Sequence, residues 1–190
     1  MDTCEEARNC RIGHLLMLGD SITQGIESER TSFCHATFLS RVFNMYLWNQ
    51  GVGGYVFDAD SVDDELGFRP DMVFVSYGTN DYTVSRDANA IRESADRYSS
   101  RVREVFTSAH IYVVSPIWRF FEEEKDYAEF FKVNDMLQEL ADRYQCRYID
   151  GRNLVTHNKQ FFYDEEIHPN EPVVSNMDMS SFVAMNPILS

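Results

Sequence analysis

Short apolar runs alternate with longer amphipathic segments along most of this chain. The run at 12–18 is nearly continuous, as in a strand that is buried on both faces of a sheet. Four more runs of strand length follow, at residues 45–48, 72–77, 111–115 and 146–149. Each of these runs is therefore predicted to be a β-strand.

Between the runs, apolar residues recur at the spacing of an α-helix. Before residue 111 they step by four, three, four and three positions, and before residue 146 by three, four, three and four. The residues concerned are Ile91, Ala95, Tyr98, Val102 and Val105, and then Phe130, Val133, Leu137, Leu140 and Tyr144. Such stripes bury one helix face against a sheet. Residues 33–46 are also predicted to be helical.

The alternation of strands and helices determines the fold class that we expect. Connections of crossover length make successive strands parallel and place helices on both faces of the sheet. No linker, repeat or low-complexity tract divides the chain, so residues 1–190 are predicted to form one α/β domain. Residues 1–10 and 171–190 are expected to be irregular tails.

Four short motifs carry the candidate chemistry, and three of them directly follow predicted strands. They are GDSITQG at 19–25, NQGVGG at 49–54, GTND at 78–81 and HPN at 168–170. In sheets of this kind, ligands bind outside the carboxyl ends of the strands. We therefore expect the motifs to converge on one edge of the sheet.

Ser21 and His168 are the candidate nucleophile and base. Ser21 lies in a tight turn after the first strand, although an isolated serine at this point is more simply a helix N-cap. A serine hydroxyl needs a base to remove its proton. Pro169 and the acidic residues just before His168 distinguish it from the four other histidines.

A catalytic imidazole needs a carboxylate on its second nitrogen, which fixes the tautomer and stabilises the imidazolium. Glu165 lies three residues before His168 and Asp164 lies four before it. Either carboxylate can fold back onto the ring within one turn. At least one member of this acidic run is expected to be ordinary surface charge.

Three groups are candidate donors to the oxyanion of a tetrahedral intermediate. They are the backbone N–H groups of Ser21 and Gly54 and the side-chain amide of Asn80. The alternative is that these loops are merely turns, which glycine and asparagine favour. Asp20 and Asp81 are interpreted as loop-fixing residues, and Asp20 is also counted as a candidate substrate-binding residue.

Composition narrows the partners that we expect. The chain has 17 basic and 31 acidic residues and a formal net charge of −14, so it offers no basic stripe for nucleic acid. The same charge disfavours anionic membranes, and no apolar run reaches the length of a membrane span. The amino-terminal residues lack the basic and apolar regions of a signal peptide, so a cytoplasmic location is expected.

The cysteines are not arranged as ligands or as a disulfide framework. Cys4, Cys10, Cys34 and Cys146 contain no CxxC pair and are expected to be free thiols in a reducing compartment. Cys4 and Cys10 together with His14 do not match a zinc-binding spacing. We expect neither a metal nor a cofactor.

Taken together, Ser21, Gly54, Asn80 and His168 resemble the four sequence blocks of the SGNH, or GDSL-type, serine hydrolases. The resemblance spans residues 12–170. It implies a flavodoxin-like three-layer α/β/α sandwich with a five-stranded parallel sheet. It also implies a metal-independent esterase that works through an acyl-serine intermediate, without the G-x-S-x-G elbow of the α/β-hydrolases.

Two features depart from the family pattern. The family usually places an aspartate three residues before the histidine, and this register slightly favours Glu165 over Asp164 as the third member of the triad. The family also follows its histidine with a glycine and a closing helix. Here Pro172 comes early, and the tail after it has only a weak helical pattern.

The segment SPIWR, beyond the fourth strand, bears on the substrate. Trp118 could stack on a sugar and Arg119 could bind a carboxylate or hydroxyls, or they are a packed tryptophan and a surface arginine. Many members of the family remove acetyl groups from carbohydrates. The expected substrate is a small acyl ester, with O-acetylated carbohydrate as the specific hypothesis. The alternative function is a catalytically silent carbohydrate-binding module that keeps the crevice.

Overall fold

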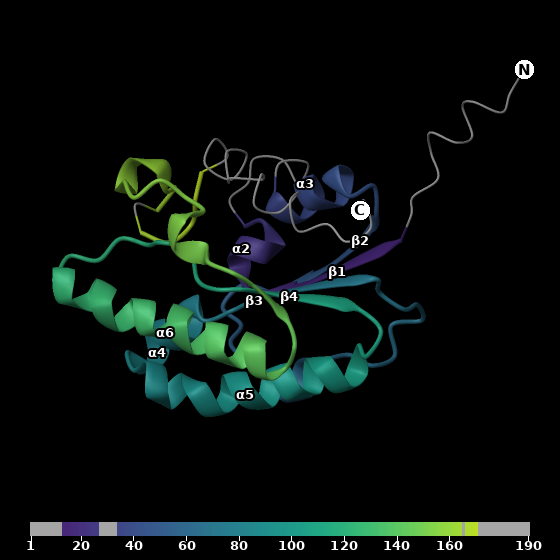
Figure 1. Ribbon diagram of the computed structural model, residues 1–190. Helices are drawn as coiled ribbons and strands as arrows, with labels where there is room; N and C mark the ends of the chain where they lie inside the picture. Colours follow the sequence, from purple (N-terminus) through teal and green to yellow (C-terminus); the bar gives the residue numbers. More distant parts are fainter. Residues whose placement is uncertain (1–12, 27–33, 165, 171–190) are drawn as a thin grey trace, which may run out of the picture.

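The computed structural model describes residues 13–26, 34–164 and 166–170, and Figure 1 shows the course of the chain. Five strands form one sheet in the order β2-β1-β3-β4-β5, and all neighbouring strands are parallel. The strands are β1 (His14–Gly19), β2 (Tyr46–Gly51), β3 (Met72–Ser76), β4 (His110–Val114) and β5 (Arg147–Ile149). The predicted parallel sheet is confirmed, with small shifts of the strand ends.

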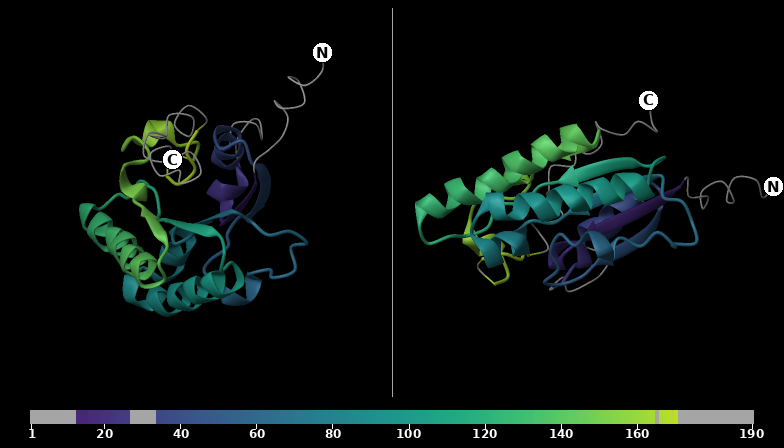
Figure 2. Two further views of the ribbon diagram at one scale, coloured as in Figure 1. Left: turned by 45° about the vertical axis from the view of Figure 1, so that its right-hand side comes forward. Right: turned by 90° about the horizontal axis from the view of Figure 1, so that it is seen from below.

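Helices cover both faces of the sheet (Figure 1, Figure 2). Helices α5 (Ala88–Val105) and α6 (Glu124–Arg143) lie along one face, and α2 (Ser21–Gln24) and α3 (His35–Val42) lie on the other. Helix α4 (Thr79–Ser85) follows β3. Short 3₁₀ turns occur at η2 (Ala59–Ser61), η3 (Gly151–Asn153) and η4 (Lys159–Phe161). This arrangement is the expected three-layer α/β/α sandwich.

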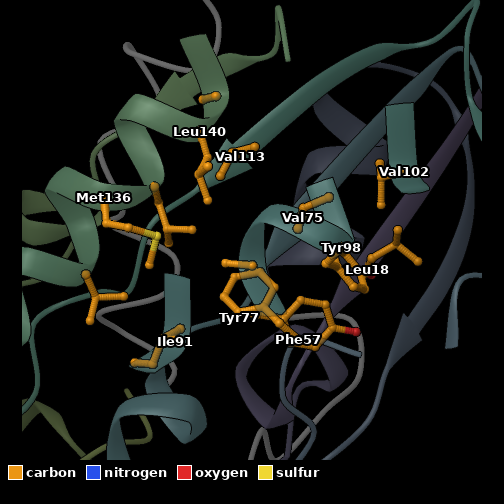
Figure 3. Packing of buried hydrophobic residues seen from close by; sticks show 14 of the residues in the cluster. Leu18, Phe57, Val75, Tyr77, Ile91, Tyr98, Val102, Val113, Met136 and Leu140 are labelled. Atoms are coloured by element: carbon orange, nitrogen blue, oxygen red, sulfur yellow. The ribbon is translucent and has the colours of Figure 1, made fainter. Parts of the chain in front are cut away.

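Alternation along the central strands divides the core between the two faces. Leu16 and Leu18 of β1 face α5 and α6, whereas Leu15 and Met17 face α3, because successive strand side chains point to opposite sides. Figure 3 shows how sheet residues pack against both long helices. The sheet contributes Leu18, Val75 and Val113, α5 contributes Ile91, Tyr98 and Val102, and α6 contributes Met136 and Leu140.

Two glycines let a helix approach the ends of β1 and β2 directly. Gly19 and Gly51 are partners in the register of the two strands. A Cβ on Gly19 would lie 2.1 Å from Thr23 Oγ1, and one on Gly51 would lie 2.3 Å from the backbone nitrogen of Gln24. Both distances are far below van der Waals contact. Only glycine therefore allows α2 to begin at the carboxyl end of β1.

A buried polar cluster fixes the carboxyl ends of β4 and β5. The Ser115 hydroxyl lies 2.7 Å from Asn134 Nδ2, 2.9 Å from the Tyr148 hydroxyl and 2.9 Å from the Gly151 backbone nitrogen. Asn134 Nδ2 also donates to the carbonyl oxygen of Pro116 at 2.9 Å. Ser115 and Asn134 are fully buried, so these bonds replace bonds to water. The cluster determines the direction in which the chain leaves β4.

The predicted tails at 1–10 and 171–190 lie outside the described residues, as do Cys4 and Cys10. Cys34 and Cys146 lie within them and are free thiols. In the described part of the chain, no helix combines the length and the apolar character that crossing a membrane requires. No three His, Cys, Asp or Glu side chains of that part are grouped so that they could hold a metal ion.

Replacing Asn134 by alanine should lower the free energy of unfolding by about 2–4 kcal/mol, because Ser115 and the Pro116 carbonyl lose a buried partner. Urea unfolding followed by circular dichroism measures the difference. Gln138→Ala is the matched control, since Gln138 lies on the same helix but is exposed. Equal stability of the two variants would contradict the role assigned to the cluster.

Candidate active site

The first turn of α2 presents Ser21 at the carboxyl end of β1. Strand β1 ends at Gly19, and the Asp20 carboxylate caps the helix by accepting a hydrogen bond from the Ile22 N–H at 3.0 Å. Ser21 is the first helical residue and is 7% exposed. The N-cap is therefore Asp20, and the Ser21 hydroxyl is left for another partner.

Ser21, His168 and Asp164 form a continuous hydrogen-bonded chain. His168 Nε2 lies 2.8 Å from Ser21 Oγ, and His168 Nδ1 lies 2.7 Å from Asp164 Oδ2. An ionised carboxylate can only accept, so Nδ1 carries a proton and Nε2 of the neutral ring accepts from the serine hydroxyl. In this geometry an imidazole can remove the serine proton.

The second oxygen of Asp164 holds the backbone that carries His168. Asp164 Oδ1 accepts hydrogen bonds from the N–H groups of Glu166, Ile167 and His168 at 3.0, 2.7 and 3.1 Å. Burial raises the pKa of Asp164, but these bonds and the one to the His168 ring outweigh burial and lower the pKa to about 2. The carboxylate is therefore charged near neutral pH and can stabilise an imidazolium.

Main-chain hydrogen bonds hold residues 161–164 and 166–170, the histidine loop, in place. The Tyr163 N–H donates to the His168 carbonyl oxygen at 2.7 Å, which closes the loop on itself. The Phe120 N–H donates to the Glu166 carbonyl oxygen at 2.9 Å, which ties the loop to the segment after β4. The position of the histidine is thus set by backbone contacts on both sides.

The acid that contacts the His168 ring lies four residues before it. Glu165, which the family register favours, lies outside the described residues. Nδ1 of His168 is bonded to Asp164. The N–H groups that converge on Asp164 Oδ1 make a tight turn that brings this carboxylate back to the ring. The register-based preference for Glu165 therefore finds no support in the geometry.

The loop after β2 passes directly beside Ser21. A Cβ on Gly53 would lie 3.9 Å from Ser21 Cβ, and the Gly53 N–H donates to Gln24 Oε1 at 2.7 Å. Gly54 has a φ of +80°, which favours glycine, and no atom lies within 4 Å of the position that its Cβ would take. No described atom therefore crowds the Cβ side of Gly54.

The loops after β2 and β3 are joined through Asn80 and Asp81. Asn80 Nδ2 donates to the Tyr55 carbonyl oxygen at 3.0 Å, which orients the amide and uses one of the two N–H groups of this nitrogen. Asp81 accepts from the Phe57 N–H at 3.0 Å and from the Gly78 N–H at 3.1 Å. Burial raises the pKa of Asp81, which these N–H groups oppose. Asp81 thus has the loop-fixing role expected for it.

Asp20 is buried, so the structure gives no support to its predicted substrate-binding role, which stays a prediction. It is 2% exposed and bonds the Ile22 N–H. Burial raises the pKa of Asp20 to about 6, although the Ile22 N–H and the nearby His168 oppose the shift. Asp20 fixes the loop instead, as the other interpretation of this residue expected.

Trp118 and Arg119 are also buried, at 7% and 4% exposure, so the structure gives no support to their predicted substrate-binding roles. The Trp118 ring stacks with the rings of Tyr127 and His157, at centroid distances of 5.9 and 5.2 Å. Arg119 Nη1 donates to Thr83 Oγ1 at 2.7 Å, so the residue is not a surface arginine either. Burial of the large apolar indole ring stabilises the fold, and this explains why Trp118 packs inside the protein and is not exposed at the crevice.

Two contributors to the site were missed by sequence reasoning. Gln24 holds Gly53 in place, and the carbonyl oxygen of Tyr55 orients Asn80. Gln24 belongs to the GDSITQG motif, so its place one helical turn after Asp20 is a signal that could have identified it. A backbone carbonyl acts independently of its side chain and leaves no signal in the sequence.

The fold and the linked serine, histidine and aspartate side chains are those of a serine hydrolase. The chain belongs to the GDSL-like Lipase/Acylhydrolase family, which matches residues 17–172. The resemblance to SGNH hydrolases is thereby confirmed. A comparison with curated proteins gave no match.

Solved structures share the fold at low sequence identity. A member of the lipolytic G-D-S-L family from Veillonella parvula has a TM-score of 0.69 and 17% identity, over 92% of this chain and 99% of that chain. A variant of an acetyl-xylooligosaccharide esterase from Geobacillus has a TM-score of 0.65 and 16% identity, over 90% of this chain and 93% of that chain. A two-domain esterase active on acetylated mannans has a TM-score of 0.64 and 20% identity, over 95% of this chain and 51% of that chain. At such identities the likeness establishes the fold.

Replacing Asp20 by asparagine should stabilise the protein above neutral pH, because asparagine keeps the helix cap without burying a charge. The folded pKa of about 6 lies above the ordinary value of 3.8, so ionisation of Asp20 costs stability as the pH rises through this interval. We expect Asp20→Asn to gain about 1–2 kcal/mol in free energy of unfolding at about pH 8, and no such gain below about pH 4.

Urea unfolding at both pH values measures the effect. Asp87→Asn is the control, because Asp87 caps α5 through the Asn89 N–H at 2.8 Å but is exposed. An equal gain in both variants, or a gain that does not depend on pH, would show that burial of the Asp20 charge is not the cause.

Proposed function

We propose that this protein is a serine esterase that hydrolyses small acyl esters, with O-acetyl groups on carbohydrates as the specific substrate class. The observation that carries the proposal is the pair of contacts made by His168, at 2.8 Å to Ser21 Oγ and 2.7 Å to Asp164 Oδ2. Membership of the GDSL-like Lipase/Acylhydrolase family supports the same class of reaction.

In the first half of the reaction, His168 Nε2 accepts the hydroxyl proton of Ser21 while Oγ attacks the carbonyl carbon of the ester. The bond from Nδ1 to Asp164 keeps the ring oriented, and the ionised carboxylate stabilises the imidazolium. The tetrahedral intermediate then breaks its bond to the alcohol oxygen, which leaves with the proton from Nε2. The acyl group stays on Ser21.

In the second half, His168 removes a proton from water while the water oxygen attacks the acyl carbon. The second tetrahedral intermediate breaks its bond to Ser21 Oγ, which takes the proton back from Nε2. The products are the free acid and the regenerated hydroxyl. The same histidine contacts serve both halves.

Three donors stabilise the oxyanion in both intermediates: the N–H groups of Ser21 and Gly54, and the side-chain amide of Asn80. The free space on the Cβ side of Gly54 and the oriented amide of Asn80 support this assignment. A donor of this type contributes about 10²–10³ in rate, because it is already aimed where negative charge develops.

The carbohydrate part of the proposal is supported by structural neighbours and not by Trp118, which is buried. Those neighbours include an esterase active on acetylated mannans and an acetyl-xylooligosaccharide esterase. Both act on small acyl groups carried by sugars. A short ester is therefore the substrate to test first.

The wild-type protein should hydrolyse p-nitrophenyl acetate faster than p-nitrophenyl decanoate, and Ser21→Ala should lower both rates at least about a thousandfold. The reason is that the variant cannot form an acyl-enzyme. Initial rates of p-nitrophenolate release measure both effects, with folding of the variant verified by circular dichroism.

Ser94→Ala is the matched control, because the Ser94 hydroxyl bonds the Ile91 carbonyl oxygen within α5, at 2.9 Å, and no catalytic group. This variant should keep wild-type rates. Faster hydrolysis of the decanoate would contradict the small-acyl assignment. A folded wild type that turns over neither ester and is not labelled by a fluorophosphonate would favour the silent carbohydrate-binding module.

Asp164→Asn should lower kcat by about 10³–10⁴-fold, because an amide no longer fixes the required tautomer of the ring. Glu165→Gln changes the next residue in the same acidic run and should leave kcat nearly unchanged. Both variants are compared on p-nitrophenyl acetate after their folding has been checked. A larger loss of kcat in Glu165→Gln than in Asp164→Asn would assign the role of the triad acid to Glu165. If neither variant lost activity, the mechanism would have no acid.

A further inference from the structure

Arg119 is buried between the two halves of the catalytic site, yet the reaction above gives it no step. It is 4% exposed, which is unusual for an arginine. Its Nη1 donates to Thr83 Oγ1 at 2.7 Å, and its Nη2 lies 4.0 Å from Glu166 Oε2. Its guanidinium carbon lies 5.1 Å from the centre of the Phe121 ring. One side chain thus contacts both α4 and the histidine loop.

Thr83 and Glu166 belong to the elements that carry the proposed catalytic groups. Thr83 lies one turn beyond Asn80 on α4, and its hydroxyl donates to the Thr79 carbonyl oxygen at 2.9 Å. Glu166 lies in the histidine loop, and its N–H donates to Asp164 Oδ1 at 3.0 Å. Arg119 therefore bridges the helix of the Asn80 donor and the loop of the acid–base pair.

Arg119 projects from a firmly held segment. The Phe120 N–H donates to the Glu166 carbonyl oxygen at 2.9 Å, so the main chain next to Arg119 binds the same loop. The start of this segment is held by the buried cluster of Ser115 and Asn134. Because its main chain is held in this way, the Arg119 side chain can determine the position of the elements that it contacts.

Folding stability alone does not account for an arginine here. Burial and the neighbouring Arg86 lower the pKa of Arg119, whereas the carboxylates of Glu166 and Asp164 raise it. Arg119 Nε is buried and has no hydrogen-bond partner among the described residues. A buried charge with an unsatisfied donor costs stability, and a well-packed apolar side chain is often the more stable choice.

We propose that Arg119 is a positioning residue that fixes the distance between the Asn80 oxyanion donor and the Asp164–His168 pair. The inference rests on the proposed esterase function and adds to it a residue that the substrate does not touch. Loss of such a residue impairs the transition state more than substrate binding, so it lowers kcat and leaves KM nearly unchanged.

The test compares kcat and KM of Arg119→Met, Arg119→Lys and Thr83→Val on p-nitrophenyl acetate. We expect Arg119→Met to lower kcat at least about tenfold, because a displacement of about 1 Å already costs a large factor in rate. Arg119→Lys should recover part of the loss, since lysine keeps the charge but not the forked geometry. Thr83→Val should cause a smaller loss, because it removes the bond from Arg119 to α4 and the bond from the Thr83 hydroxyl to the Thr79 carbonyl oxygen but leaves the contact between Arg119 and Glu166 in place.

Arg92→Met is the matched control, since it breaks an exposed ion pair between Arg92 and Glu139 at 2.8 Å. It should leave both kinetic constants unchanged. Thr83→Val keeps the proposal testable if Arg119→Met fails to fold, because the arginine itself stays in place. Wild-type kcat in Thr83→Val, with Arg119→Met unfolded, would then overturn the proposal.

A second measurement does not depend on turnover. The proton that His168 Nδ1 shares with Asp164 is observable as a far-downfield signal in the proton NMR spectrum. We expect Arg119→Met to shift or broaden this signal and Arg92→Met to leave it in place. A wild type that shows the signal but hydrolyses no ester contradicts the esterase function, while the response of the signal to Arg119→Met still decides the role of Arg119.

Other outcomes would overturn the positioning role in distinct ways. A raised KM at unchanged kcat would make Arg119 a substrate contact. Lower stability with both kinetic constants and the NMR signal unchanged would make it a packing residue only.

Discussion

The site depends on the different hydrogen bonds that the two oxygens of the Asp164 carboxylate make. Oδ1 of Asp164 collects three main-chain N–H groups and so shapes the histidine loop, while Oδ2 holds the His168 ring. The ring in turn reaches Ser21 at 2.8 Å. A carboxylate bonded in this way is both charged and immobile, and a histidine base needs both properties in its partner. The geometry of the loop and the electrostatics of the proposed reaction therefore have a common origin.

Buried polar side chains hold the rest of the site in register with this carboxylate. Asp20 caps α2, Asp81 joins the loops after β2 and β3, and Arg119 bridges α4 and the histidine loop. Burial of each charged group costs desolvation free energy, and for Asp20 this cost appears as a raised pKa. The cost is consistent with a site whose groups must stay within a fraction of an ångström of a working geometry.

The sequence did not reveal the direction in which side chains near the strand ends point. Asp20 directly follows β1, and Trp118 and Arg119 lie in the segment beyond β4, where a crevice was expected, but each side chain is buried. A position at a strand end specifies the edge of the sheet and does not specify which way the side chain points. The preference for Glu165 has the same weakness, because a count of residues does not reveal the turn that brings Asp164 to His168.

By itself, the sequence determined the parallel sheet, because strands buried on both faces must be apolar and their connecting helices must be amphipathic. It also determined which residue types follow the strands, so Ser21, Gly54 and Asn80 could be named as candidates in advance, while Pro169 and the acidic residues before His168 singled out that histidine. Only the tertiary structure decided which acid contacts the histidine, which polar side chains are buried and how Arg119 bridges two elements. Those features depend on hydrogen bonds and burial between segments far apart in the chain, as in the contact between Ser21 and His168, which lie 147 residues apart.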